Sequence, residues 1–168
     1  DFHVIPTDTV TIRLDKEAIL RSGVMLPHSI RHLKGEELIN ALPEKLEISL
    51  KEVRMLTKMD LLILEMIANC NWERPLYMAI SVGEASNLKL DNYFVMEGLA
   101  YRFAPFDYKQ WGDSDEHNSH VVDVEKLYTN VMQRYKYGGL DTPGLYIDET
   151  TMRLCYSHRR LFTQLALK

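Results

Sequence analysis

Short segments with the two-residue period of a β-strand alternate along this chain with segments that carry helix start signals. Thr9–Leu14 and Lys45–Leu50 place apolar residues at every second position, the pattern of a half-buried strand. Leu76–Ser81 is a continuous apolar run, which predicts a central strand, and Glu97–Phe103 predicts another. Strands separated by helices favour a single soluble α/β domain over residues 1–168, with a mixed sheet of about four or five strands flanked by helices.

Capped segments predict helices between and after these strands. Thr57 and Asp60 have the spacing of a capping box, and the residues that follow are apolar on nearly every side as far as Asn69. Such a helix is expected to be buried on more than one side. Asp123 precedes the clearest amphipathic pattern of the chain, which ends at the glycine pair 138–139.

The C-terminal part of the chain predicts a short strand at Leu145–Ile147 and a last helix over residues 149–168, capped by Asp148. The pattern of this helix continues to Lys168 without a Gly, Asn or Pro to end it. We therefore expect the natural chain to continue, with the last helix leading into a helical repeat region.

Charge and apolar patterning argue against two broad classes of protein. Lys and Arg number 20 against 24 Asp and Glu, so the net charge is −4, whereas nucleic-acid-binding domains are strongly basic. The longest apolar stretch, Leu61–Ala68, is interrupted by Glu65 and is far shorter than the about 20 residues that a membrane span needs. The sequence also lacks a phosphate-binding glycine loop, a GxSxG elbow and an HExxH motif, which disfavours the common nucleotide-binding, hydrolase and protease classes. No cofactor is predicted.

Two polar clusters contain donor atoms that a metal ion uses. His28, His32 and Glu36 are spaced by four residues, but a proline and a glycine in this segment oppose a continuous helix. A surface or packing role is therefore favoured. Residues 107–120 are expected to form an exposed loop. Residues 113–123 hold carboxylates together with His117 and His120, without the spacing of a calcium-binding loop. Neither cluster predicts a metal site.

The two cysteines, Cys70 and Cys155, lie within or beside apolar helical patterns and do not form a CxxC pair. Two buried free thiols are the favoured interpretation. A disulfide between them is the alternative, and it requires an extracytoplasmic domain.

A cluster after the first capped helix, Asn71–Pro75, contains the side chains with the best potential for recognition. Trp72 and Arg74 belong to residue types that are common binding anchors, and Tyr101 and Arg102 would complete a cleft. The favoured alternative is structural: a tight connection in which the tryptophan covers the end of the helix and the proline starts the next strand.

Four segments together carry a family resemblance. They are Lys58–Ile80 (with N-C-N-W-E-R-P-L-Y-M-A-I), Asp91–Pro105 (D-N-Y-F-V-M-E-G-L-A-Y-R-F-A-P), Tyr128–Leu140 and Tyr146–Phe162. The chain resembles the soluble C-terminal portion of large bacterial multi-pass membrane proteins of unknown function. The membrane part of these proteins is similar to protein O-mannosyltransferases, which use a polyprenyl-phosphate-linked sugar, and tetratricopeptide-type repeats often follow the soluble portion.

The resemblance implies a place in a larger membrane protein. It implies a non-catalytic extracytoplasmic domain at the periplasmic face of the inner membrane, with its own membrane part, an acceptor polypeptide or a polyprenyl-phosphate sugar as partners. No catalytic residue carries over, because the acidic catalytic loops of that superfamily lie in the membrane part. The alternatives are a structural spacer and a stand-alone sugar- or phosphosugar-binding module or small enzyme. The matching positions without an assigned role are Trp72, Glu73, Arg74, Pro75, Tyr93, Glu97, Tyr101, Arg102, Gly138, Gly139 and Asp148.

Overall fold

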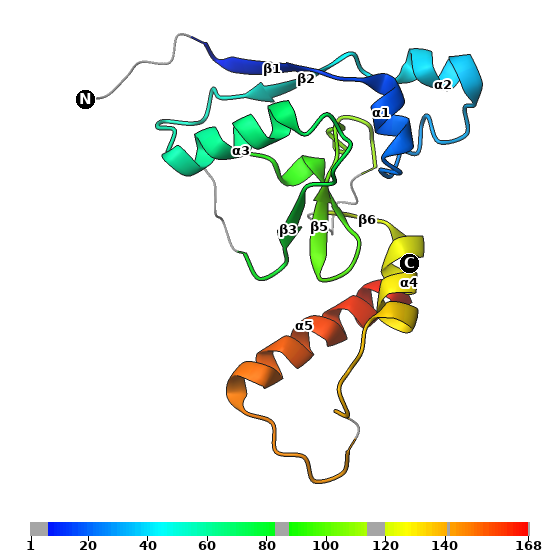
Figure 1. The fold of residues 1–168 in the computed structure, drawn as a ribbon, viewed down its shortest axis with the longest axis vertical. Helices are drawn as coiled ribbons and strands as arrows, with labels where there is room; N and C mark the ends of the chain where they lie inside the picture. The colour runs from blue at the N-terminus through cyan, green and yellow to red at the C-terminus, as the bar shows by residue number, and fades with distance from the viewer. Residues whose placement is uncertain (1–6, 83–87, 114–119, 141, 168) are drawn as a thin grey trace.

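The computed structural model describes residues 7–82, 88–113, 120–140 and 142–167, and Figure 1 shows how its elements are arranged. Short 3-10 and π-helical turns cover Asp91–Tyr93 and Asn130–Arg134. The helices and strands in chain order are β1 (Thr9–Arg13), α1 (Lys16–Arg21), α2 (Gly35–Ala41), β2 (Lys45–Ser49), α3 (Lys58–Asn69), β3 (Tyr77–Ala79), β4 (Phe94–Met96), β5 (Ala100–Phe103), β6 (Val121–Val122), α4 (Val124–Thr129) and α5 (Glu149–Ala166).

The strands form two sheets. β1 and β2 pair with each other in antiparallel register, and the other four lie in the order β3-β5-β4-β6. In the larger sheet β5 is antiparallel to both of its neighbours, whereas β6 runs parallel to β4. The predicted α/β class with a mixed sheet of four strands and flanking helices is therefore confirmed.

Several predicted elements differ from the structure. β3 was expected to be central, but among the described strands it pairs with β5 alone and forms an edge of the larger sheet. The single strand expected at 97–103 is the second half of a hairpin, since β4 ends at Met96 and β5 begins at Ala100. No strand forms at 145–147. These segments are apolar, and apolarity alone does not specify which neighbour a strand finds.

The helix α3 begins at the predicted capping box, because the Thr57 hydroxyl accepts from the Asp60 amide while the Asp60 carboxylate accepts from the Thr57 amide. The prediction that this helix is buried on more than one side is wrong, however. Leu61 and Leu62 are 54% and 59% exposed, whereas Leu64 is buried. α3 thus covers the sheets with one face and leaves apolar side chains on the other.

The larger core lies between the two sheets and α1, α2 and α3. One residue from the stretch 107–120, which was predicted to be an exposed loop, belongs to it: Tyr108 is fully buried, as is the preceding Phe106. The Tyr108 hydroxyl donates to the Met25 carbonyl over 2.5 Å. The Tyr93 hydroxyl donates to the Glu47 carbonyl and so ties the larger sheet to β2. Residues 114–119 of that stretch, including His117, lie outside the described residues.

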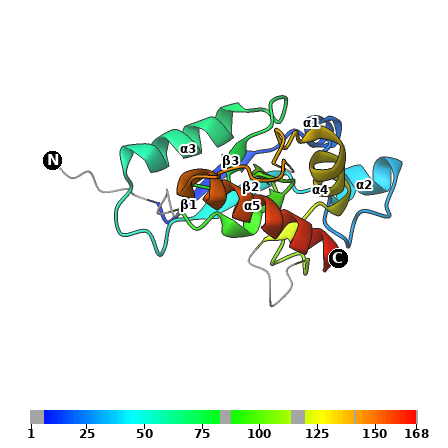
Figure 2. The same ribbon diagram turned by 90° about the horizontal axis from the view of Figure 1, so that it is seen from below.

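A smaller core joins α4 and α5 to the sheet. It is centred on Leu127, Val131 and Leu161, which pack with Met96 and Tyr101. Figure 1 shows α5 at the end of the molecule away from β1 and β2, and in Figure 2, which is seen from below, α5 crosses the front of the molecule. Asp148 caps α5 as predicted, by accepting from the amides of residues 150 and 151. Whether α5 leads into a repeat region stays a prediction.

Within the described ranges, no helix is both long enough and apolar enough to cross a bilayer.

Candidate functional site

Trp72, the first of the predicted binding residues, is a packing residue in this structure. It follows α3 in a tight turn in which both Asn71 and Trp72 have positive φ, 46° and 60°. The indole is only 7% exposed and stacks on Phe103, with ring centroids 6.1 Å apart. Because its faces are covered, the ring offers no platform on which a sugar could stack.

The other three predicted residues point in different directions. Tyr101 and Arg102 are neighbours on β5, so their side chains lie on opposite faces of the sheet. Arg102 is buried and donates to the carbonyls of Ser22 and Gly23 over 2.6 and 3.2 Å. Arg74 is exposed in the turn after α3. The structure thus does not gather the four side chains in one cleft, and their role in binding stays a prediction.

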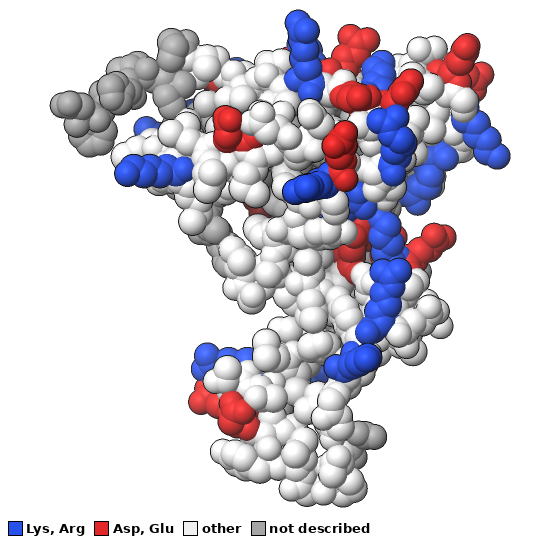
Figure 3. Space-filling view, in the orientation of Figure 1, with Lys and Arg blue, Asp and Glu red and all other residues white. Residues whose placement is uncertain are grey.

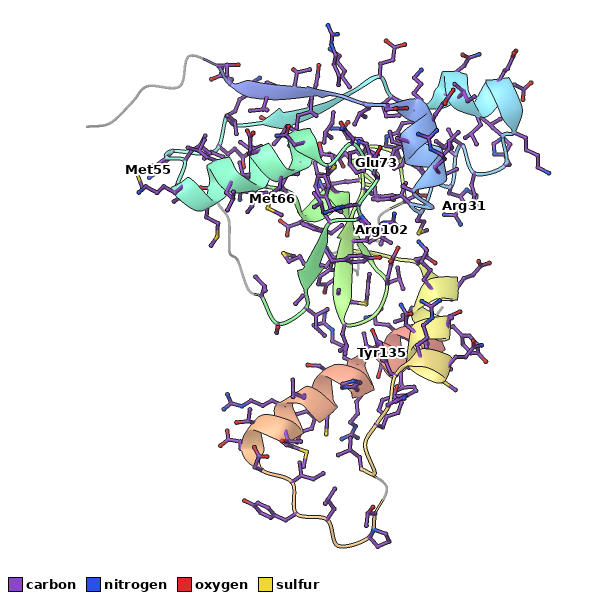
Figure 4. All side chains as sticks on the ribbon, viewed as in Figure 1. Arg31, Met55, Met66, Glu73, Arg102 and Tyr135 are labelled. Carbon is purple, nitrogen blue, oxygen red and sulfur yellow. The ribbon has the colours of Figure 1, made fainter. Side chains whose placement is uncertain are left out.

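Arg102 belongs to a buried polar cluster centred on Glu97, a residue that the sequence did not single out as functional. One carboxylate oxygen of Glu97 lies 2.6 Å from the Lys126 ammonium and 3.6 Å from the Arg102 guanidinium. The other oxygen accepts from the Tyr77 hydroxyl over 2.8 Å, and the Glu97 backbone carbonyl accepts from the side-chain amide of Asn130 over 2.6 Å. Figure 4 shows Arg102 among the elements that it joins.

This cluster has the chemistry of a structural tie. Its charges are opposite in sign, and its donors and acceptors are hydrogen-bonded to one another, which makes the burial of charge tolerable. Burial and the hydrogen bond to Glu97 raise the pKa of Tyr77, so the phenol stays a donor. The cluster connects four parts of the fold and fixes their relative positions: β3, the β4–β5 hairpin, α4, and the turn that follows α1.

A hollow of about 890 Å³ lies between α3 and the larger sheet. Its wall is mainly apolar, with methionines from three separate segments: Met55 before α3, Met66 on α3 and Met78 on β3. Figure 4 shows Met55 and Met66 beside α3, and the surface below this helix is mostly uncharged (Figure 3). Methionine adapts its shape easily, so this wall suits occupants of varied sequence.

A few polar groups border the hollow. The Tyr101 ring lies 4.5 Å from the His120 ring, and a His120 nitrogen is 3.3 Å from the Asp91 carbonyl. The pKa of Tyr101 is raised, because the effect of burial outweighs the opposite effect of the nearby Arg160. Charged side chains of both signs stand at the rim, with Glu52, Arg54, Lys89 and Asp91 all exposed. The hollow therefore has an apolar floor and a rim without a dominant charge.

His28, His32 and Glu36, the first set considered as metal ligands, do not form a centre. His28 and His32 lie in turns, and Glu36 lies in the separate helix α2, so the three do not share a helix face. The His28 amide donates to the Asp113 carboxylate. Within the part of the chain that the structure describes, no group of three His, Cys, Asp or Glu residues could hold a metal ion. Cys70 and Cys155 are free and half-buried.

Fold and hollow together define a mixed α/β domain with an apolar recess beside a sheet edge. Comparison with known families matches residues 1–126 to TMEM260-associated domain 2, and TMEM260 is a family related to protein O-mannosyltransferases. The match covers three quarters of the chain, including its first fifty residues, so the chain belongs to this family. No curated protein and no solved structure matches it.

Proposed function

We propose that this chain is a non-catalytic binding domain of a multi-pass, glycosyltransferase-like membrane protein of bacteria, and that it binds the acceptor polypeptide in the hollow between α3 and the sheet. The domain would lie outside the cytoplasm, at the periplasmic face of the inner membrane, beside its own membrane part. The family membership supports the association with a membrane protein related to O-mannosyltransferases. The apolar hollow is the observation that carries the binding role.

The lining of the hollow favours a polypeptide over the sugar carrier. A polyprenyl phosphate needs cations for its phosphate, but the basic Arg54 and Lys89 at the rim are matched by the acidic Glu52 and Asp91. A sugar would need exposed aromatic faces and convergent polar groups, and Trp72 is covered by Phe103. An apolar, methionine-rich wall accommodates the mixed side chains of an unfolded segment.

Binding of an unfolded chain to the purified domain tests this proposal. The probe is a reduced, alkylated and fluorescently labelled model protein, and its anisotropy is followed as the 168-residue chain is added. Met66→Glu places a carboxylate in the hollow, whereas Met59→Glu makes the same change on the same helix outside the lining. The two methionines are equally exposed, at 48% and 52%, so the pair is matched.

We expect saturable binding that Met66→Glu weakens by at least about tenfold and Met59→Glu leaves nearly unchanged, since about 1.4 kcal/mol of lost apolar contact corresponds to a factor of ten. Absence of saturable binding, or equal effects of the two variants, would refute the assignment of the hollow. Glycosyl transfer or hydrolysis by the chain alone would refute the non-catalytic role.

A further inference from the structure

The edge strand β3 has backbone groups that point away from its neighbour β5. The Phe103 amide donates to the Leu76 carbonyl over 2.9 Å, and the Ile80 amide donates to the Leu99 carbonyl over 3.1 Å. In an antiparallel pair, residues alternate between facing the partner strand and facing away from it. The amides and carbonyls of Tyr77 and Ala79 therefore face away from β5.

The groups on this side are accessible for pairing within the described ranges. No described strand pairs with the outer side of β3. The Ala79 carbonyl accepts from the Val82 amide, which leaves the Tyr77 amide and carbonyl and the Ala79 amide facing outward. Both residues are exposed. A row of outward amides and carbonyls is the template on which a further strand can form.

β3 carries none of the side-chain devices that usually prevent such pairing. Edge strands are commonly protected by lysine, by proline or by an inward-pointing charge. The strand reads Tyr-Met-Ala, and its proline, Pro75, precedes the strand and does not interrupt it. This edge is therefore suited to strand addition.

The same strand lines the apolar hollow. Residues 76–80 all belong to the lining, together with Tyr101 and Phe103 on the neighbouring strand and Met66 on α3. A strand added beside β3 would carry alternate side chains on the two faces of the sheet, so every second side chain would face α3 and enter the hollow. Hydrogen bonds would then set the register, while the apolar side chains would supply the affinity.

We infer that the hollow and the β3 edge are one binding site for an extended polypeptide segment with apolar residues at alternate positions, which joins the sheet as a strand next to β3. The inference rests on the proposed function and specifies how the acceptor is bound. It excludes a helical occupant, because a helix uses its backbone groups internally, and a proline-rich one, because proline lacks the amide proton.

The test compares three peptides that have the same side chains. The parent is a peptide of about nine residues, long enough to cover β3 and its flanks, in which isoleucine alternates with threonine. One derivative is N-methylated at the isoleucine amides and the other at the threonine amides. Each set lies along a different edge of the extended peptide, so only one set faces β3. Binding to the 168-residue chain is measured by calorimetry.

We expect the parent peptide to bind, one methylated derivative to lose at least about tenfold in affinity, and the other to keep the parent affinity. On binding, hydrogen exchange at the Tyr77 and Ala79 amides should slow. Ala79→Pro, which removes an outward amide without removing a bond to β5, should weaken the parent peptide as well. This variant is checked for an unchanged circular dichroism spectrum.

The other outcomes separate the inference from the function on which it rests. Equal binding of all three peptides would overturn strand addition while a polypeptide site in the hollow would stand. Binding of none of them, together with failure of the unfolded protein to bind, would overturn both. Self-association of the chain that Ala79→Pro abolishes would assign the edge to a second copy and would also overturn the inference.

Discussion

Replacing Glu97 by glutamine tests whether the buried polar cluster holds the fold together. The substitution keeps the shape and the hydrogen-bonding oxygen for Tyr77 but removes the charge that faces Lys126 and Arg102. Removing one partner of a buried ion pair costs about 3–5 kcal/mol of unfolding free energy. Lys126 is partly exposed and keeps Asp123 at 3.2 Å. Arg102 keeps its two carbonyl acceptors, so we expect the lower end of the range, about 3 kcal/mol.

Urea unfolding followed by circular dichroism measures this loss. With a slope of about 2 kcal/mol per molar, the midpoint should fall by about 1.5 M. Glu149→Gln is the matched control, because Glu149 pairs with Arg153 on the surface of α5 and both side chains are more than three-quarters exposed. An exposed pair of this kind is worth about 0.5 kcal/mol or less. If the two substitutions lower the midpoint equally, the cluster is not the structural tie that we describe.

Three further changes test the packing around the site. Burial raises the pKa of Tyr108 far above that of an unfolded tyrosine, so this phenol ionises above about pH 10 only in the unfolded chain, and stability should fall there as the pH rises. Tyr108→Phe should make this loss of stability less steep, and an unchanged pH profile would contradict its assignment to Tyr108. At Gly98, where φ is 147°, an added Cβ would clash with the Tyr135 hydroxyl oxygen. Gly98→Ala should therefore destabilise the fold by about 2 kcal/mol, and Tyr135→Phe should partly restore the stability. Equal urea midpoints for the wild type and Gly98→Ala would refute the contact. In a Trp111→Phe background, monosaccharides should not change the emission of the covered Trp72, and a saturable change would revive the sugar-binding alternative.

The local signals in the sequence predicted where elements begin better than how they pair. Thr57, Asp123 and Asp148 each accept from the amides that the sequence indicated, because capping depends on residues within one turn. Strand order depends on contacts between distant segments. The separate pairing of β1 with β2, and the place of β3 at the edge, could therefore not be obtained from apolar runs.

The site could be predicted only in part for the same reason. Among the four residues proposed for binding, Tyr101 is the one that lines the hollow. Tryptophan and arginine are frequent in binding sites and also frequent in cores and buried ion pairs, so their residue type did not decide between these roles. The methionines gave no local signal, because Met55, Met66 and Met78 come from three segments that only the fold brings together. Glu97 could not be assigned to a buried cluster from the sequence, because its partners Tyr77, Arg102 and Lys126 lie on three different elements.

Tyr77 connects the structural tie to the proposed binding edge. Its hydroxyl donates to Glu97 inside the buried cluster, while its amide and carbonyl lie on the outer side of β3. A three-residue strand with one neighbour would fray easily, and frayed backbone groups must be ordered again before a ligand can pair with them. The bond to Glu97 holds β3 in its extended form in the absence of a ligand and so reduces the entropy that binding has to overcome. Tyr77→Phe should therefore cost more binding free energy for the alternating peptide than unfolding free energy, as the urea midpoint reports it. The variant loses order at the edge, while Glu97 keeps both of its cations. A loss of stability without a loss of peptide affinity would show that the cluster supports the fold alone and does not prepare the edge.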